Sequence, residues 1–175
     1  VDAAGGDYFP KNPIEGALLA LKEDPSLQII LIGPEDIINR ELEKHSYDAQ
    51  RLSVQYAAEI ITMEDSPTAA VKTKRNSSIS VGINLHKEGK CDAFVSAGNT
   101  GALLAASTFI LGKLPGVLRP TIASYFPTLK GFRLLVDAGA NLELKPEHAV
   151  QFAKMGQIYC QHVMGVESPK VGLMN

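Results

Sequence analysis

Three glycine-containing loops carry the residue types from which an anion-binding site can be built. They are Asp2–Asp7 (DAAGGD), Ser96–Ala102 (SAGNTGA) and Asp137–Asn141 (DAGAN), and each follows a stretch that reads as a strand. Glycine lets the backbone approach a ligand closely, and the amides at the start of a following helix face an anion. Any one loop could equally be a tight strand-to-helix turn. Three such loops at one edge of a sheet favour a small anionic ligand.

Polar and charged side chains in and after these loops are the candidate site residues. Lys145 and His148 begin a predicted helix, where positive side chains oppose the helix dipole unless an anion compensates them. His148 could also exchange a proton near neutral pH, although a structural histidine is an equal alternative. The loop residues that we expect to bind the anion or the substrate are Asp2, Gly5, Gly6, Asp7, Ser96, Gly98, Thr100, Gly101, Asp137, Gly139 and Asn141.

A basic cluster lies outside the loops. Lys72, Lys74 and Arg75 follow one another closely and could neutralise a phosphate or attract an acidic partner. The alternative is a solvated helix end, where lysines complement the dipole, and the sequence alone favours that interpretation.

Several other chemistries lack their sequence signatures. None of the three loops is a P-loop or a G-x-G-x-x-G dinucleotide fingerprint, and no G-x-S-x-G nucleophile motif occurs. Cys91 and Cys160 are far apart in sequence, and no grouping of His, Cys or Glu has metal-ligand spacing. We therefore expect no metal and no cofactor.

The loops are joined by short apolar runs that alternate with helical patterns. Strands are predicted at 28–32, 93–95, 121–126 and 133–136, with a further candidate at 52–56. Helices are predicted at 13–23, from 65–67 onward, from Ser77 or Ser78 to Gly89, at 101–111 and at 146–164. A capping box at Asn12 and Glu15 is expected to start the first of them. This alternation predicts an α/β fold with a mostly parallel sheet, whose ligands bind at the carboxyl ends of the strands.

Length and composition suit one α/β domain with a sizeable core. The 175 residues are 45% hydrophobic and 21% charged, and the net charge of -2 gives no basic field for nucleic acid. No apolar run reaches the roughly 18 to 20 residues that cross a bilayer. Two cysteines fit a reducing compartment. Val1 reads as the end of a strand and residues 171–175 as another strand, so we expect the chain to be cut at both ends.

Taken in order, the loops and five further segments resemble the bacterial phosphate acyltransferase family PlsX. The segments are Lys74–Ser78 (KRNSS), Arg119-Pro120, Pro127–Gly131 (PTLKG), Lys145–His148 (KPEH) and Pro169–Leu173 (PKVGL). The resemblance covers essentially the whole chain, and SAGNTGA followed by KPEH is its most specific part. Ala4 departs from the usual methionine of the family and Tyr8 from a common histidine. Members are about twice as long, which implies that residues 1–175 are a single but incomplete α/β domain.

The resemblance implies a fold and a reaction. The fold is a three-layer one with helices on both faces of the sheet, similar to isocitrate and isopropylmalate dehydrogenases, in a homodimer. The reaction converts acyl-[acyl-carrier protein] and inorganic phosphate into acyl phosphate and free carrier, for phospholipid synthesis. The expected location is cytoplasmic, with peripheral association at the inner face of the membrane through regions outside this sequence.

The chemistry of that reaction agrees with the residues in the loops. Phosphate is already an anionic nucleophile, and a thiolate with a pKa of about 8.5 leaves readily, so the site must mainly position charge and stabilise an oxyanion. We expect the loops to cradle phosphate and Asn99, Lys145 and His148 to be catalytic. Lys72, Lys74 and Arg75 are the expected contacts for the acidic carrier protein.

Three rival functions stay open at this point. A short-chain phosphate acyltransferase that uses coenzyme A would share the fold and the reaction type. A non-catalytic module could use the same loops to bind phosphate or a lipid precursor. A dinucleotide-dependent dehydrogenase of the same fold group has little support, because its fingerprint is missing.

Overall fold

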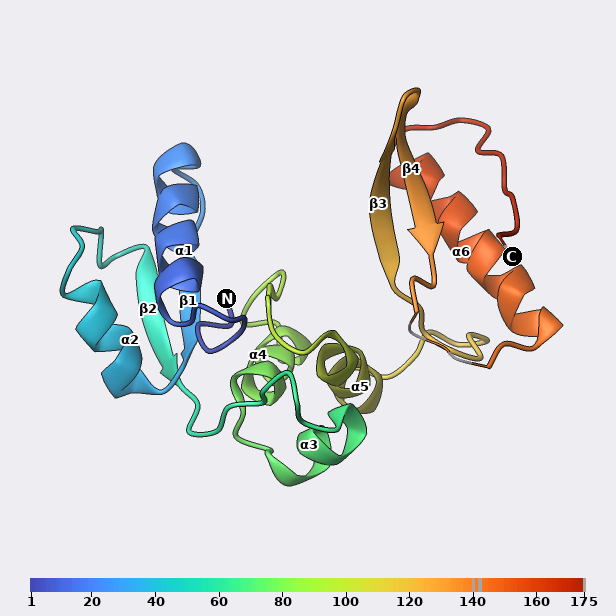
Figure 1. The fold of residues 1–175 in the computed structure, drawn as a ribbon. Coiled ribbons are helices and arrows are strands. Elements are labelled where there is room, and N and C mark those ends of the chain that lie inside the picture. Colours follow the sequence, from blue (N-terminus) through green and yellow to red (C-terminus); the bar gives the residue numbers. More distant parts are fainter. Residues whose placement is uncertain (140, 142, 175) are drawn as a thin grey trace. The chain divides into compact units, whose positions relative to one another are not determined.

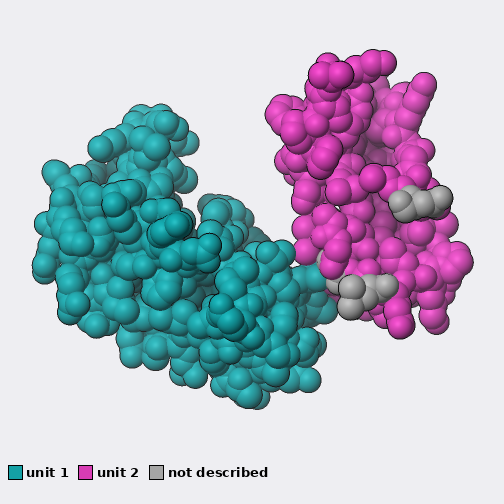
Figure 2. All heavy atoms as spheres, in the orientation of Figure 1, with its two compact units in different colours: residues 1–112 teal, residues 113–175 magenta. Residues whose placement is uncertain are grey.

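The computed structural model describes residues 1–139, 141 and 143–174. It divides the chain into two compact units, Val1–Gly112 and Lys113–Asn175 (Figure 2). Each unit contains both helices and strands, so the chain is α/β, as the alternation of patterns predicted. The two units are described separately below.

A small parallel sheet organises the first unit. Strand β1 (Ile29–Gly33) pairs in parallel with β2 (Leu52–Tyr56), so that Ile29 lies opposite Leu52. The segment 1–3 lies along β1, where Asp2 forms a parallel bridge with Ile32 and the Ala3 N–H donates to the Ile32 carbonyl (2.9 Å). The strands predicted at 28–32 and 52–56 are confirmed.

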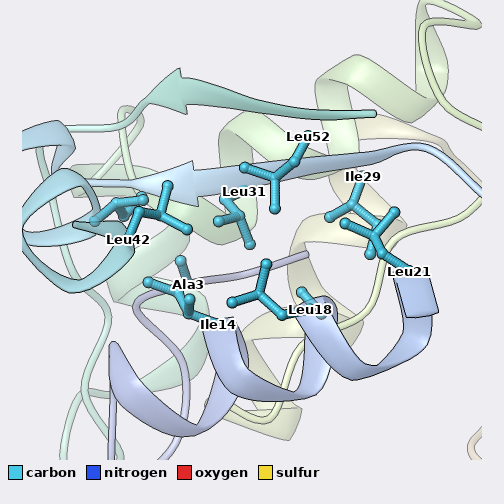
Figure 3. Close-up of a cluster of buried hydrophobic side chains, with 10 residues drawn as sticks. Ala3, Ile14, Leu18, Leu21, Ile29, Leu31, Leu42 and Leu52 are labelled. Carbon is cyan, nitrogen blue, oxygen red and sulfur yellow. The ribbon is translucent and has the colours of Figure 1, made fainter. Parts of the chain in front are cut away.

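Helices pack on both faces of β1. The first face packs against α1 (Lys11–Glu23) and α2 (Glu35–Leu42), and the second against α4 (Ser78–Lys87). Figure 3 shows the first face, where side chains of α1 point toward the strands. Its buried residues are Ala3, Ile14, Ala17, Leu18, Leu21, Ile29, Leu31, Ile38, Leu42 and Leu52. Burying so much apolar side-chain surface is the main force that holds the sheet to the helices.

The first helix begins earlier than predicted. It starts at Lys11, follows Pro10, and has no side-chain cap, so the expected capping box at Asn12 and Glu15 is wrong. The reason is the preceding turn: the Tyr8 carbonyl accepts from the Asn12 N–H (3.0 Å) and the Pro10 carbonyl from the Ile14 N–H (3.1 Å). Backbone carbonyls thus satisfy the amides that a side-chain cap would otherwise serve.

A second cluster of helices completes the unit (Figure 1). Helices α3 (Pro67–Thr73) and α5 (Thr100–Ile110) pack so closely that a Cβ on Gly101 would lie 2.7 Å from Pro67 Cγ. Helix α4 is capped by Ser77, whose Oγ accepts from the Ser80 N–H (3.3 Å), as the sequence predicted. The expected helices at 101–111 and from 65–67 onward are also confirmed.

The strand predicted at 93–95 does not form in the described part of the chain. The Asp2 N–H donates to the Val95 carbonyl (2.8 Å), so the segment lies beside residue 2, but a single bond makes no ladder. Val95 is 63% exposed. An apolar run becomes a buried strand only with paired neighbours, and the expectation is wrong because the described residues do not supply them.

The second unit consists of a hairpin and one long helix. Strands β3 (Ala123–Thr128) and β4 (Gly131–Val136) pair antiparallel, whereas the sequence predicted a mostly parallel sheet. The loop between them is too short for the crossover that parallel strands need. Helix α6 (Pro146–His162) packs on β4, where a Cβ on Gly156 would lie 2.8 Å from Val136 Cγ2.

The expected strands at 121–126 and 133–136 and the expected helix at 146–164 are confirmed with shifted ends. Residues 171–174 form no strand, so the terminal strand predicted there is wrong for the described positions. Asn175 lies outside the described residues. In the ranges that the structure describes, no helix is both long and apolar enough to cross a membrane.

Candidate anion-binding site

The first two glycine loops interlock at the carboxyl end of segment 1–3. The Ser96 hydroxyl donates to Asp2 Oδ2 (2.6 Å), and Ser96 Oγ in turn accepts from the Gly98 N–H (3.0 Å). The other carboxylate oxygen of Asp2 accepts from the Ala4 N–H (3.1 Å). Residues that are 94 positions apart in sequence therefore form one hydrogen-bonded unit.

Glycine is required at the point where the two loops touch. A Cβ on Gly5 would lie 2.6 Å from Asp2 Oδ2 and 2.9 Å from the Gly98 nitrogen. Gly6 has a φ of +87°, in the region that side chains rarely adopt, and faces Ala97. Here glycine serves close packing of two backbones.

Several backbone amides of these loops have no protein partner. The N–H groups of Gly5, Gly6, Ala97 and Thr100 make no hydrogen bond to the residues that the structure describes. Thr100 opens α5, so its amide also carries the positive end of the helix dipole. Unpaired amides in neighbouring glycine loops form a concavity suited to an anion.

Asn99 is buried and fully engaged within the protein. Its Oδ1 caps α5 by accepting from the Ala102 N–H (3.0 Å), and its Nδ2 donates to the carbonyls of Thr62 (3.0 Å) and Asp65 (3.2 Å). All the donors of its amide group are thereby used. No sequence pattern predicts the contacts with Thr62 and Asp65, although an asparagine before a helix is a common cap.

The basic cluster divides between two environments. Lys74 faces inward, where its ammonium group donates to Asp65 Oδ2 (2.5 Å) and to the Ile60 carbonyl (2.9 Å). Lys72 and Arg75 are exposed, and the Lys72 ammonium lies 5.7 Å from the centre of the Phe109 ring. Only Lys72 and Arg75 are positioned for an outside partner.

The Asp65–Lys74 ion pair makes a prediction about stability in acid. The hydrogen bond from Lys74, and then the Thr62 N–H, lower the pKa of Asp65 below its ordinary value of 3.8. A lowered folded-state pKa stabilises the protein above the unfolded value, and this stabilisation is lost as pH falls through the folded value. We expect wild type to unfold at a higher temperature than Asp65→Asn near pH 7, and the two midpoints to converge as pH falls below the unfolded value of 3.8 and through the lowered folded-state pKa.

Thermal unfolding followed by circular dichroism between pH 7 and pH 2.5 measures that difference. The comparison with the variant is needed because the pKa values of Asp24 and Glu41 are lowered as well, so wild type alone would not isolate Asp65. A gap between wild type and variant that does not change with pH would contradict the prediction.

A cavity of about 700 Å³ adjoins the interlocked loops within the first unit. Gly5, Gly6 and Ala97 contribute to its wall, together with α1, β1 and the segment 90–95. Most of the lining is apolar, with side chains such as Ile29 and Val95. Its volume falls within the roughly 300–1,000 Å³ typical of small-molecule sites.

The third loop lies in the second unit and ties its own side chains together. Asp137 has a φ of +66°, and its Oδ1 accepts from Asn141 Nδ2 (2.8 Å) and from the Thr121 hydroxyl (3.3 Å). Gly139, with a φ of +81°, donates its N–H to the Asp137 carbonyl (2.8 Å). Ala140 and Leu142 lie outside the described residues. Convergence of this loop with the other two stays a prediction.

Lys145 and His148 occupy the start of α6. The Lys145 N–H donates to His148 Nδ1 (3.3 Å), and the His148 N–H donates to the Lys145 carbonyl (2.9 Å). His148 is buried and accepts at Nδ1, so a neutral ring would carry its proton on Nε2. The Lys145 residue is exposed. His148 thus has a structural role here, and its role in catalysis stays a prediction.

Among the described residues, no three side chains of His, Cys, Asp or Glu gather into a group that could hold a metal ion. Of the predicted site residues, the structure brings together those of the first two loops. Asp7 is exposed and, like Tyr8, lines the cavity.

Known proteins are similar to this chain over its whole length. A family described as fatty acid synthesis protein matches residues 1–175. The chain is similar to a phosphate acyltransferase of Halothermothrix orenii, with 49% identity over 175 residues, which are 100% of this chain and 52% of that protein. Phosphate acyltransferases of Acetivibrio thermocellus (48%) and Chlorobaculum parvum (49%) match with the same coverage. The chain spans about half the length of the curated relatives it matches.

Proposed function

The chain belongs to the fatty acid synthesis protein family, and from this premise we propose that it contributes to a phosphate acyltransferase that converts acyl-[acyl-carrier protein] and inorganic phosphate into acyl phosphate and free carrier. The observation that carries the proposal is the pair of interlocked glycine loops, whose free amides lie at the carboxyl end of segment 1–3. Such amides suit phosphate, which is one of the two substrates of the proposed reaction.

The reaction needs two anions to be held at the same place. A phosphate oxygen attacks the thioester carbonyl carbon, a C–O bond forms, and an oxyanion develops on the former carbonyl oxygen. When that intermediate collapses, the C–S bond breaks and the carrier leaves as a thiolate, which takes a proton from water. Backbone amides stabilise such charge without having to reorganise, so a strong general base is not required.

The proposed residue roles depend on which groups are not already hydrogen-bonded within the protein. The amides of Gly5, Gly6, Ala97 and Thr100 are the proposed phosphate donors. Asn99 contributes by fixing the start of α5, since its side chain is engaged. In the second unit, the exposed Lys145 is proposed to meet the reacting anion, supported by His148 and by the loop residues Asp137, Gly139 and Asn141.

The apolar cavity supports a substrate with a hydrocarbon chain. Its wall shares Gly5, Gly6 and Ala97 with the loops, so an acyl group bound there would place its carbonyl carbon beside the proposed phosphate site. Apolar walls favour transfer of methylene groups from water by about 0.8 kcal/mol each.

Further parts of the proposal rest on the family. We include the three-layer dehydrogenase-like fold, which the packing of helices on both faces of β1 supports. We also include a homodimer, a cytoplasmic location and peripheral association with the inner face of the membrane. Lys72 and Arg75 are the proposed contacts for the acidic carrier protein, because Lys74 is occupied by Asp65.

The test is a carrier-release assay on the full-length protein with and without phosphate. We expect release of free carrier thiol and formation of acyl phosphate to depend on phosphate and to saturate with it, leaving only slow hydrolysis when phosphate is omitted. Equal release in both conditions would contradict the reaction. Turnover of acetyl-coenzyme A but not of carrier thioesters would assign the short-chain function, and phosphate binding without turnover would assign a binding module.

A further inference from the structure

A buried carboxylate lies beneath the two glycine loops and has no role in the reaction as proposed. Asp2 is 2% exposed, and each of its oxygens accepts a hydrogen bond: Oδ1 from the Ala4 N–H and Oδ2 from the Ser96 hydroxyl. A charge is costly to bury unless hydrogen bonds compensate it. The two hydrogen bonds offset this cost, and they fix the carboxylate between the two loops.

The bonds around Asp2 leave little for a ligand. The Ser96 hydroxyl has one proton and donates it to Asp2, so it cannot also donate to phosphate. The Gly98 N–H is likewise used, because it donates to Ser96 Oγ. A carboxylate beside a phosphate would also repel it, which disfavours Asp2 as a phosphate ligand. Asp2 and Ser96 were expected from the sequence to bind the anion directly, and their contacts point to another role.

We propose that Asp2 is a positioning residue that, through Ser96, holds the loop of residues 96–98 against the loop of residues 4–6 at the spacing at which their free amides share one anion. This inference rests on the proposed function for the identity of the anion, phosphate. The chain of bonds runs from the Ala4 N–H through Asp2 and the Ser96 hydroxyl to the Gly98 N–H. Gly5 fits between Asp2 and Gly98 because it has no side chain.

The two possible replacements of Asp2 have different consequences. In Asp2→Asn, the amide oxygen can still accept from Ala4, and Nδ2 can donate to Ser96 Oγ, so the loops stay connected. In Asp2→Ala, both bonds are lost. Ser96→Ala breaks the same chain from the other side and also frees the Gly98 amide.

The experiment measures kcat and the KM for phosphate in the full-length protein for Asp2→Ala, Asp2→Asn, Ser96→Ala and the double variant Asp2→Ala/Ser96→Ala. Asp36→Asn, an exposed aspartate in the first turn of α2, is the matched control. Losing a hydrogen bond to a charged group corresponds to roughly 10- to 100-fold in an equilibrium. We expect Asp2→Ala and Ser96→Ala to raise the KM for phosphate by about 10-fold or more with little change in kcat.

The KM of Asp2→Asn for phosphate is expected to stay within about threefold of the wild-type KM, because this variant keeps the loops joined. The KM of the double variant for phosphate should be no higher than that of the more severe single variant, since the two single substitutions break the same connection. A fall in kcat with unchanged KM would mean that Asp2 only maintains the fold, and would overturn the inference. Equal KM values for Asp2→Asn and Asp2→Ala, below that of wild type, would instead show direct repulsion of phosphate and would overturn it too.

Amide hydrogen exchange keeps the inference testable if the full-length protein shows no phosphate-dependent turnover, a result that would remove the proposed function alone. Ser96→Ala should then speed exchange at the Ala4 amide, and Asp2→Ala should speed exchange at the Gly98 amide, each at least 10-fold by the same argument. Unchanged exchange at the distant amide in both variants would show that the loops are not held together by Asp2.

Discussion

Gly5→Ala is expected to lower kcat/KM for acyl transfer to phosphate by at least about 100-fold in the full-length protein. The added methyl group would lie 2.6 Å from Asp2 Oδ2 and 2.9 Å from the Gly98 nitrogen. Neither neighbour can move aside easily, because one is a buried carboxylate with both oxygens bonded and the other is backbone. The two loops must therefore separate, and their free amides can no longer meet the same anion.

The same substitution at a glycine in open space separates this effect from a general effect of alanine. Gly172 has no atom within 4 Å of the position that a Cβ would take, and its φ lies outside the left-handed region. Gly172→Ala should retain wild-type kcat/KM and wild-type thermal stability. Both variants differ from wild type by one methyl group, so only its surroundings distinguish them.

Steady-state kinetics with varied phosphate, together with thermal unfolding, check this prediction. Gly5→Ala should remain folded at assay temperature, because overpacking by one methyl group typically costs about 1–3 kcal/mol. A folded Gly5→Ala protein with activity within threefold of wild type would show that the spacing of the loops does not matter. The proposed phosphate site would then have to lie elsewhere.

The strands and helices show what a local sequence pattern can predict. Apolar runs at β1 and β2 and helical spacing in α1 and α5 were sufficient to place strands and helices. This part succeeded because burial and secondary structure depend on residues within a few positions of each other.

Contacts between distant segments could not be predicted in the same way. Nothing in the sequence links Asn99 to the carbonyls of Thr62 and Asp65, because a carbonyl oxygen is the same in every residue. Lys74 likewise reads as a surface charge until its partner Asp65 is known. At 93–95 the apolar run predicted a strand that does not form, since a strand needs paired neighbours and the run itself does not specify them.

Asn99→Ala is expected to lower the free energy of unfolding by about 3 kcal/mol, combining the loss of a helix cap with the loss of two partly buried hydrogen bonds to the carbonyls of Thr62 and Asp65. Asn99→Ser is the informative companion, because a serine hydroxyl can still cap α5 but cannot reach Thr62 and Asp65 as well. We expect serine to recover about 1 kcal/mol, the usual contribution of a cap. Denaturant unfolding of the two variants and wild type measures the difference.

Activity measured on the folded variants then decides between two roles for Asn99. If the side chain acts by holding the start of α5, Asn99→Ser should keep kcat within about 10-fold of wild type, since the cap keeps the Thr100 amide in place. If the amide group instead touches the reacting atoms, kcat should fall by about 100-fold or more even in the folded serine variant, as when an oxyanion donor is removed. The internal bonds of Asn99 favour the first result, because an amide group with its donors used inside the protein has none left for a substrate.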